Sequence, residues 1–203
     1  MNDYLCTTID LIRHGEPQGG KKYRGHLDDP LSDKGWQQMR SAIADHHPWQ
    51  AIVSSSLTRC SEFAQEVSNR YQLPITLDER LMELGFGEWE GKTATELLQD
   101  DPDRLNRFWS DPISNPPPGG ESLVDFQTRV TAGWQSAITQ HKGQHLLMVG
   151  HAGMMRMIIR EILGMPLDNM FRIQVPNAGI TRITIDHHDD GDLARLQFHA
   201  GQL

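Results

Sequence analysis

Cysteine is scarce in this chain, and the motifs of two common phosphate-handling classes are missing. The 203 residues include only Cys6 and Cys60, too few for a disulfide framework. Cysteine-based phosphatases need Cys-x5-Arg, but Arg13 comes one residue too late after Cys6, and Glu66 occupies that place after Cys60. A Gly-x4-Gly-Lys-Ser/Thr sequence is also absent, so nothing supports a P-loop nucleotide site.

Basic charge and long apolar runs are lacking as well. The 19 Lys and Arg are outnumbered by 27 Asp and Glu, which gives a formal net charge of −8 at pH 7. Nucleic acids and anionic membranes need a basic face, so neither is an expected partner. No apolar run approaches the ~20 residues of a membrane-spanning helix, and residues 1–5 lack the features of a signal peptide. We therefore expect a cytoplasmic protein.

Strand-like and helix-like segments alternate along the chain. Aliphatic and β-branched runs predict strands at 6–12, 51–53, 74–77 and 145–149. Each is followed, directly or after a connecting region, by a helical pattern, at 33–45, 57–71, 122–140 and 152–163. Segments 180–185 and 193–198 predict a terminal hairpin around an Asp-Asp-Gly turn. This alternation predicts the α/β class, with a mostly parallel central sheet flanked by helices.

The middle of the chain differs from this pattern. The capping-box spacing from Thr93 to Glu96 predicts the start of a helix, and a further short helix is expected over 101–111. A proline- and glycine-rich stretch at 114–120 then ends the region. We interpret residues 79–121 as an inserted lobe over the sheet, within a single domain of residues 1–203.

Three predicted strand ends carry groups suited to phosphate chemistry. They supply Arg13-His14, Ser54 to Arg59, and Gly150-His151, and ligands of parallel α/β sheets bind beyond such ends. Arginine holds phosphate oxygens in bidentate fashion, a neutral imidazole can attack phosphorus, and a second imidazole can stabilise the developing charge. A single histidine at a strand end is more often a packing residue, but four such residues at three ends are much less expected by accident.

At this point the sequence resembles the histidine phosphatase superfamily, which includes the cofactor-dependent phosphoglycerate mutases. Five segments over about residues 6–186 carry the resemblance, in order: Leu11-Ile12-Arg13-His14-Gly15-Glu16, Pro30 to Gln37, Ser54 to Arg59, Glu83 to Gly91, and Val149-Gly150-His151-Ala152-Gly153. The resemblance implies the three-layer, phosphoglycerate mutase-like sandwich with a helical insertion over the active site.

The resemblance also implies site residues. His14 would be the nucleophile that becomes phosphorylated, with Arg13, Arg59 and His151 around the phosphoryl group. Glu83 would protonate the leaving oxygen and then take a proton from the attacking water. No cofactor and no metal are implied. The pair His46-His47 and the run 187–190 could bind metal adventitiously, but such polar stretches are usually solvated.

The departures from the family pattern favour hydrolysis over mutase activity. Mutases of the family are typically longer and carry an Asn shortly after the nucleophile, where this chain has Gly19-Gly20-Lys21. Within the phosphatases, the segments around 13–17, 19–32 and 117–122 look most like α-ribazole phosphatases. That resemblance implies a small phosphorylated substrate, α-ribazole 5′-phosphate.

Other functions stay open at this point. The alternatives are a broad-specificity sugar-phosphate or protein phosphatase of the same family and, with less support, a phosphoglycerate mutase or a non-catalytic phosphate-binding relative. Of the tryptophans, Trp36, Trp49, Trp109 and Trp134 are expected in packing, whereas Trp89 could equally form a pocket wall. The sequence does not indicate an oligomeric state.

Overall fold

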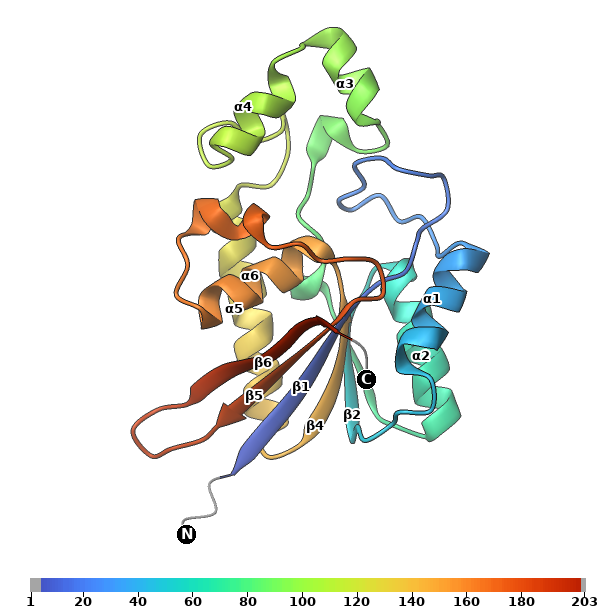
Figure 1. Ribbon diagram of the computed structural model, residues 1–203, viewed down its shortest axis with the longest axis vertical. Coiled ribbons are helices and arrows are strands. Elements are labelled where there is room, and N and C mark those ends of the chain that lie inside the picture. The colour runs from blue at the N-terminus through green and yellow to red at the C-terminus, as the bar shows by residue number, and fades with distance from the viewer. Residues whose placement is uncertain (1–4, 202–203) are drawn as a thin grey trace.

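The computed structural model describes residues 5–201, and its centre is one six-stranded sheet (Figure 1). The strand order is β3-β2-β4-β1-β5-β6. The bounds are Cys6–Arg13 for β1, Ala51–Ser55 for β2, Ile75–Asp78 for β3, His145–Gly150 for β4, Ile180–Asp186 for β5 and Leu193–Gly201 for β6. Strands β3, β2, β4 and β1 run parallel, and β5 and β6 add an antiparallel hairpin. The predicted mostly parallel sheet is confirmed.

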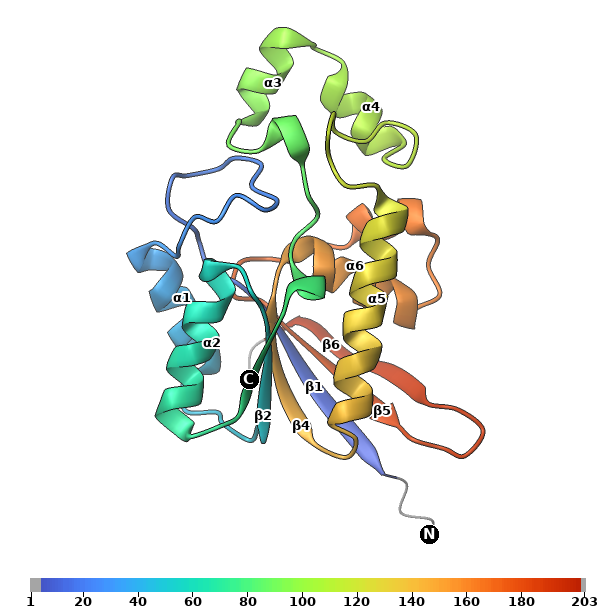
Figure 2. The ribbon, with the colours of Figure 1, turned by 180° about the vertical axis from the view of Figure 1, so that it is seen from behind.

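Helices cover both faces of the sheet, as seen from the two sides in Figures 1 and 2. Helices α1 (Asp33–Ile43) and α2 (Thr58–Tyr71) lie on one face, and α5 (Leu123–Gln140) and α6 (Ala152–Ile162) on the other. Successive side chains of a strand point to opposite faces. Ile12 of β1 accordingly packs with the α1–α2 side, whereas Ile9 and Leu11 pack with the α5–α6 side. The predicted three-layer class is confirmed.

The inserted segment stands above the carboxyl ends of the strands (Figure 1). It contains the 3₁₀ turns η1 (Glu79–Leu81) and η2 (Gly87–Trp89) and the short helices α3 (Ala94–Asp100) and α4 (Arg104–Ser110). The capping box at Thr93 and Glu96 forms as predicted. The helix expected over 101–111 begins only at Arg104, because the Asp101 carbonyl accepts the Arg104 N–H and its carboxylate accepts the Asp103 N–H in a turn between α3 and α4. A further turn, η3 (Leu167–Arg172), follows α6.

The lobe has a small apolar core of its own, formed by Trp89, Leu97, Leu105 and Phe108. Trp89 is only 1% exposed and packs edge-on against Tyr23 and Phe108. Trp49 and Trp134 are buried and Trp36 packs against Phe63, as expected; Trp109 packs against Phe108 and Phe171 but stays 48% exposed. Within residues 5–201, no helix is long and apolar enough to span a membrane.

Candidate active site

The three strand ends singled out from the sequence are neighbours in the sheet. In the pairing of β1 with β4, Arg13 lies opposite Gly150, and in that of β2 with β4, Ser54 lies opposite Val149. The His14 backbone N–H donates to the Gly150 carbonyl at 2.9 Å. The segments that carry the two histidines are therefore joined directly at this edge of the sheet.

His14 is held as a neutral imidazole with one nitrogen available. The side chain is 5% exposed, and its Nδ1 lies 2.7 Å from the Gly15 carbonyl. A carbonyl only accepts hydrogen bonds, so Nδ1 carries the hydrogen and Nε2 keeps its lone pair. Burial, followed by the charges of Arg13 and Arg59, holds the pKa of His14 well below its ordinary value. This arrangement suits nucleophilic attack by Nε2.

His151 lies beside His14 and is completely buried. The two rings meet edge to face with their centroids 5.3 Å apart, and the Nε2 of His151 is 2.7 Å from Ser55 Oγ. Burial and the charge of Arg59 keep its pKa well below the ordinary value, so this imidazole is neutral as well. Cys60 packs beneath it with Sγ 3.5 Å from Nε2, and burial raises the pKa of that thiol. Such a thiol is no nucleophile.

Arg13 and Arg59 are anchored by backbone carbonyls and retain N–H groups that bind no carbonyl. Arg13 Nη1 donates to the Val175 carbonyl at 2.6 Å, and Arg59 donates to the carbonyls of Leu27 and Gly25 at 2.9 and 2.8 Å. Within the described residues, the buried Nε of each arginine has no hydrogen-bond partner. Both guanidinium groups also line the cavity described below, so their N–H groups are placed to meet the oxygens of a bound phosphoryl group.

The Glu83 carboxylate is fixed by two backbone N–H groups. Its Oε1 accepts from Leu84 at 2.9 Å, and its Oε2 accepts from Gly153, in the first turn of α6, at 3.1 Å. A Cβ on residue 153 would lie 2.2 Å from Glu83 Oε1. Only glycine therefore allows the carboxylate to approach the helix so closely.

These groups surround one cavity of about 190 Å³. The residues that line it are Arg13, His14, Lys22, Tyr23, Arg24, Gly25, Arg59, Glu83, Phe86, Ala152 and Arg156. Four of the five predicted site residues are among them, and His151 lies behind His14. Tyr23 and Phe86 form the aromatic side, with Trp89 packed behind Tyr23, so the idea that Trp89 itself walls the pocket was wrong.

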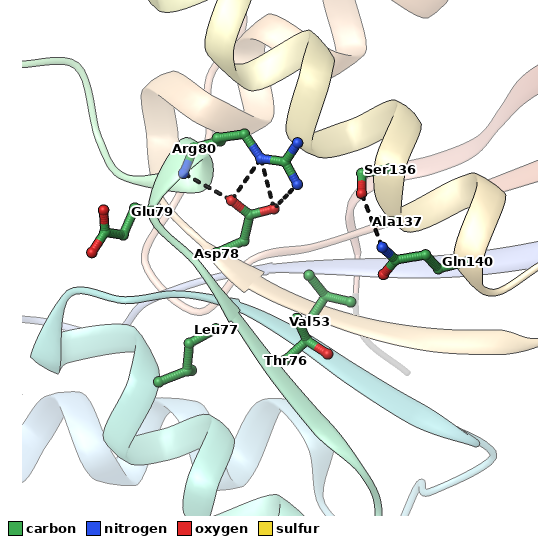
Figure 3. A pocket seen from close by; sticks show the side chains of 9 residues that line it. All are labelled: Val53, Thr76, Leu77, Asp78, Glu79, Arg80, Ser136, Ala137 and Gln140. Atoms are coloured by element: carbon green, nitrogen blue, oxygen red, sulfur yellow. Dashed lines mark hydrogen bonds and ion pairs between the residues drawn. The ribbon is translucent and has the colours of Figure 1, made fainter.

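A larger cavity, of about 330 Å³, lies elsewhere, between β3 and α5 (Figure 3). Its charged side chains include Asp78 and Arg80, which pair with each other, and Ser136 binds Gln140. No histidine lines it. Size therefore does not identify the reactive cavity, whereas the chemistry of the lining does.

Sequence reasoning missed Arg156, which lines the reactive cavity. Its Nε donates to the Ile173 carbonyl at 2.8 Å, and its guanidinium lies 5.8 Å from the centre of the Phe171 ring. Within residues 5–201 it forms no ion pair with a carboxylate, whereas Lys22 and Arg24 share Asp29. Its signal in the sequence was a cation within the otherwise apolar stretch 152–159, in the first half of the helical segment.

No metal-binding arrangement accompanies these residues. In the described part of the chain, no group of three or more His, Cys, Asp or Glu side chains is placed to hold a metal ion. The arginine and lysine side chains that line the cavity fit an anionic substrate.

Comparison with known proteins agrees with this geometry. The model of the histidine phosphatase superfamily, branch 1, matches residues 9–197. The chain belongs to this superfamily. The adenosylcobalamin/alpha-ribazole phosphatase of Escherichia coli is 29% identical over 180 residues, covering 87% of this chain and 89% of the relative. The glucosyl-3-phosphoglycerate phosphatase of Mycolicibacterium vanbaalenii is 32% identical over 171 residues, covering 78% and 75%.

Solved structures of this histidine phosphatase family share the fold. The alpha-ribazole phosphatase of Shigella flexneri superposes with a TM-score of 0.77 at 28% identity, covering 93% of this chain and 95% of that one. Some mycobacterial relatives are longer proteins, of whose length the chain covers 55%. The protein is a phosphoric monoester hydrolase of the superfamily.

Proposed function

We propose that this histidine phosphatase hydrolyses α-ribazole 5′-phosphate to α-ribazole and phosphate through a phosphohistidine on His14. The observation that supports the chemical step is the neutral His14, with its Nε2 lone pair, in one cavity with the guanidinium groups of Arg13 and Arg59. The same cavity supplies a carboxylate, Glu83, for proton transfer.

The first half-reaction transfers the phosphoryl group to the protein. His14 Nε2 attacks phosphorus while the P–O bond to the leaving group breaks, and protonated Glu83 gives its proton to that oxygen. Arg13 and Arg59 hold the equatorial oxygens, whose negative charge they match. His151 supports the His14 ring, and a hydrogen bond from it to the phosphoryl group stays a prediction.

The second half-reaction returns the protein to its starting state. A water molecule attacks the phosphohistidine, the P–N bond breaks, and Glu83 takes one proton from that water. The sum is one phosphomonoester and one water converted to one alcohol and one phosphate. No redox partner or cofactor enters this balance.

The substrate assignment is supported by the aromatic side of the cavity and by the named relatives. Tyr23 and Phe86 meet edge to face at 5.2 Å and line the cavity together with His14. Aromatic side chains bury a flat base such as the benzimidazole of α-ribazole favourably. Relatives named for alpha-ribazole occur among both the sequence and the structure matches.

A second candidate is a phosphorylated hydroxy acid, and Arg156 favours it. This cation has no carboxylate ion pair in the described chain, yet it lines the cavity beside Glu83 and Arg13. A substrate carboxylate would give it a bidentate partner. The named glucosyl-3-phosphoglycerate relative fits this alternative.

Phosphate release from a panel of substrates tests these proposals. The panel is α-ribazole 5′-phosphate, 3-phosphoglycerate, fructose 2,6-bisphosphate and p-nitrophenyl phosphate, assayed with a chelator present. We expect kcat/KM for α-ribazole 5′-phosphate to exceed the other values by at least tenfold. A higher value for 3-phosphoglycerate would replace the first candidate by the second, and uniformly low values would overturn both.

A further inference from the structure

Glu83 lies in a segment that is itself neither helix nor strand. Residues 82–86 connect η1 with η2 and pair with no strand. Backbone carbonyls in such a segment need partners from elsewhere, since unpaired polar groups are costly when they leave water. The position of the Glu83 carboxylate therefore depends on what holds this backbone.

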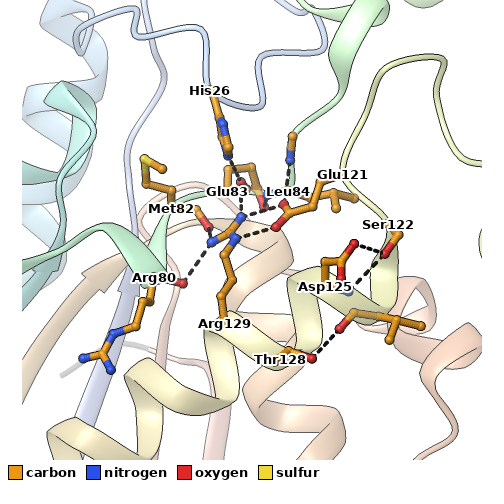
Figure 4. Close-up of polar contacts among 12 residues, drawn as sticks. His26, Arg80, Met82, Glu83, Leu84, Glu121, Ser122, Asp125, Thr128 and Arg129 are labelled. Atoms are coloured by element: carbon orange, nitrogen blue, oxygen red, sulfur yellow. Dashed lines mark hydrogen bonds and ion pairs between the residues drawn. The ribbon is translucent and has the colours of Figure 1, made fainter.

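The guanidinium of Arg129 binds three of the backbone carbonyls around Glu83. Arg129, in the second turn of α5, donates from Nη1 to the carbonyls of residues 80 and 82 at 2.9 and 2.8 Å, and from Nη2 to the Glu83 carbonyl at 2.8 Å (Figure 4). The remaining N–H groups bind the Glu121 carboxylate, from Nε at 2.5 Å and from Nη2 at 2.7 Å. All five donors of the guanidinium are thus used.

Glu121 extends this contact across the base of the lobe. Its Oε2 also accepts the Gly85 N–H at 3.1 Å, and its own N–H donates to the Gly85 carbonyl at 2.9 Å. Glu83 lies where the chain enters the lobe and Glu121 where the chain leaves it. Arg129 joins both to the helix that packs on the sheet, while His26 adds a contact from its Nε2 to the Glu83 carbonyl at 3.0 Å.

We propose that Arg129, held flat by Glu121, is a positioning residue for proton transfer by Glu83. The five hydrogen bonds of the Arg129 guanidinium fix the backbone before residue 83 directly and the backbone after it through Glu121. The Glu83 carboxylate is thereby directed toward Gly153 and the cavity. Misplacement of a reacting group by about 1 Å can cost a factor of about 100 in rate. The inference rests on the proposed role of Glu83 as the acid of the first half-reaction.

The dependence of the rate on the leaving group tests it. An alkyl phosphate, the best one of the substrate panel, needs a proton on its leaving oxygen, whereas p-nitrophenolate is a stable anion that departs without one. We expect Arg129→Gln to lower kcat/KM by about 100-fold for the alkyl phosphate and by less than about fivefold for p-nitrophenyl phosphate. A role in folding alone would lower both values equally, and that result would overturn the proposal.

Two further variants separate geometry from charge and from loss of fold. Arg129→Lys keeps the charge but cannot make all five hydrogen bonds, so it should also lose far more kcat/KM for the alkyl phosphate than for p-nitrophenyl phosphate. Full activity on the alkyl phosphate would overturn the proposal. Glu121→Gln should move the ratio in the same direction by a smaller factor, and it provides the test if Arg129→Gln does not fold. Arg80→Gln is the matched control: only the backbone carbonyl of residue 80 belongs to the network and is kept, whereas the Arg80 side chain binds Asp78 and the Ala132 carbonyl, so the ratio should stay unchanged.

Glu83→Gln distinguishes failure of this inference from failure of the mechanism. A strong split in Glu83→Gln without one in Arg129→Gln would refute only the positioning role. Equal losses on both substrates in Glu83→Gln would instead remove Glu83 as the acid, and the inference about Arg129 would fall with it.

Discussion

At the scale of single residues, the reactive cavity keeps its imidazoles uncharged among arginines. Because His14 donates from Nδ1 to the Gly15 carbonyl, its tautomer is set before substrate arrives. Burial and the nearby charges of Arg13 and Arg59 lower its pKa well below the ordinary value. A nucleophile that is already neutral needs no deprotonation step at physiological pH.

This state can be observed directly by nitrogen-15 NMR of the histidine rings. An ordinary histidine is about half protonated at pH 6.5, whereas His14 should still be the neutral Nδ1–H tautomer at that pH and should protonate only at lower pH. Rings of the urea-unfolded chain, which titrate near the ordinary value, serve as the reference. An Nε2–H tautomer, or titration of His14 near pH 6.5, would contradict the geometry described above.

Replacing the nucleophile gives the second prediction at this scale. His14→Ala should lower turnover of every phosphomonoester by at least about 1,000-fold, because no other imidazole with a free nitrogen lines the cavity. A phosphorylated intermediate, trapped by rapid quenching at alkaline pH, should appear in the unaltered protein and be lost in the variant. An intermediate that persists in His14→Ala would place the phosphoryl group on another residue.

Sequence motifs that include a residue and its neighbours identified side chains that lie together in the structure, although their catalytic roles stay predictions. Arg13, His14, Arg59 and Glu83 follow from short segments at strand ends, and all four line one cavity. Arg129 could not be identified in this way, because it acts on Glu83 from 46 positions away in the chain. The positioning role of Arg129 arises from the packing of α5 beside the lobe, and a local sequence pattern carries no information about that packing.

At the scale of the elements, one buried carboxylate ties three strands together. Asp10 of β1 is fully buried and accepts hydrogen bonds from Arg182 of β5 at 2.7 Å, from His145 of β4 at 2.9 Å and from Trp49 before β2 at 2.8 Å. Burial alone would raise the pKa of Asp10, but these hydrogen bonds outweigh it and lower the pKa to about 2.

Removing this charge should cost stability and leave catalysis intact. Asp10→Asn leaves buried donors of Arg182, His145 and Trp49 without a full partner, so the free energy of unfolding in urea at pH 7 should fall by about 3 kcal/mol. The exposed Asp100→Asn, with the same change of charge, should alter it by less than about 0.5 kcal/mol. If Asp10→Asn were as stable as the unaltered chain, the hydrogen bonds of Asp10 would make no net contribution to the free energy of unfolding.

The same network predicts a dependence on pH with a definite sign. The folded-state pKa of Asp10 lies at about 2, below the ordinary value of 3.8, so its contribution is complete above pH 3.8 and is lost as the pH falls through that range toward 2. The difference in unfolding free energy between the unaltered chain and Asp10→Asn should therefore shrink as the pH is lowered from 5 to 2. A difference that stays constant over this range would contradict the shift.

Element boundaries show what periodicity could and could not provide. The strands predicted at 51–53 and 145–149 are present but extend to Ser55 and Gly150. Ser54 and Ser55 are polar, which is typical of a loop, yet both are buried because Ser55 binds His151 and the Ser54 hydroxyl donates to a backbone carbonyl. The functional end of the strand is thus where its sequence least resembles a strand.

At the scale of the whole molecule, the lobe and the sheet meet around the cavity. The placement of residues 79–121 over the strand ends agrees with the expectation, but the contacts that hold the lobe there were not predicted. Glu90 makes one set of these contacts: its carboxylate accepts the N–H groups of His26, Leu27 and Phe86 at 2.9, 2.8 and 3.0 Å. It thereby joins the loop after β1 to the lobe.

That loop is also where Arg59 is anchored, so Glu90 connects the lobe to the phosphate site. Arg59 donates to the carbonyls of Gly25 and Leu27, on either side of the His26 amide that Glu90 holds. A Cβ on residue 25 would lie 2.1 Å from Glu90 Oε1, so the tight fit requires glycine there. Loss of the Glu90 carboxylate should loosen the loop and, through it, the arginine.

Glu90→Ala should therefore weaken phosphate binding through Arg59, although residue 90 does not line the cavity. We expect kcat/KM to fall about tenfold for alkyl and aryl phosphates alike, with a matching rise in the inhibition constant of inorganic phosphate, because the phosphoryl site and not the leaving group is affected. Glu88→Ala, two positions away and exposed, removes the same charge and should change neither value. Arg129→Gln is expected to discriminate between leaving groups, whereas Glu90→Ala is not. The two variants together would then assign the Arg129 contacts of the lobe to protonation of the leaving oxygen and the Glu90 contacts to binding of the phosphoryl group. If Glu90→Ala reproduced the leaving-group split, the lobe would act on both groups as one unit and this division would be wrong.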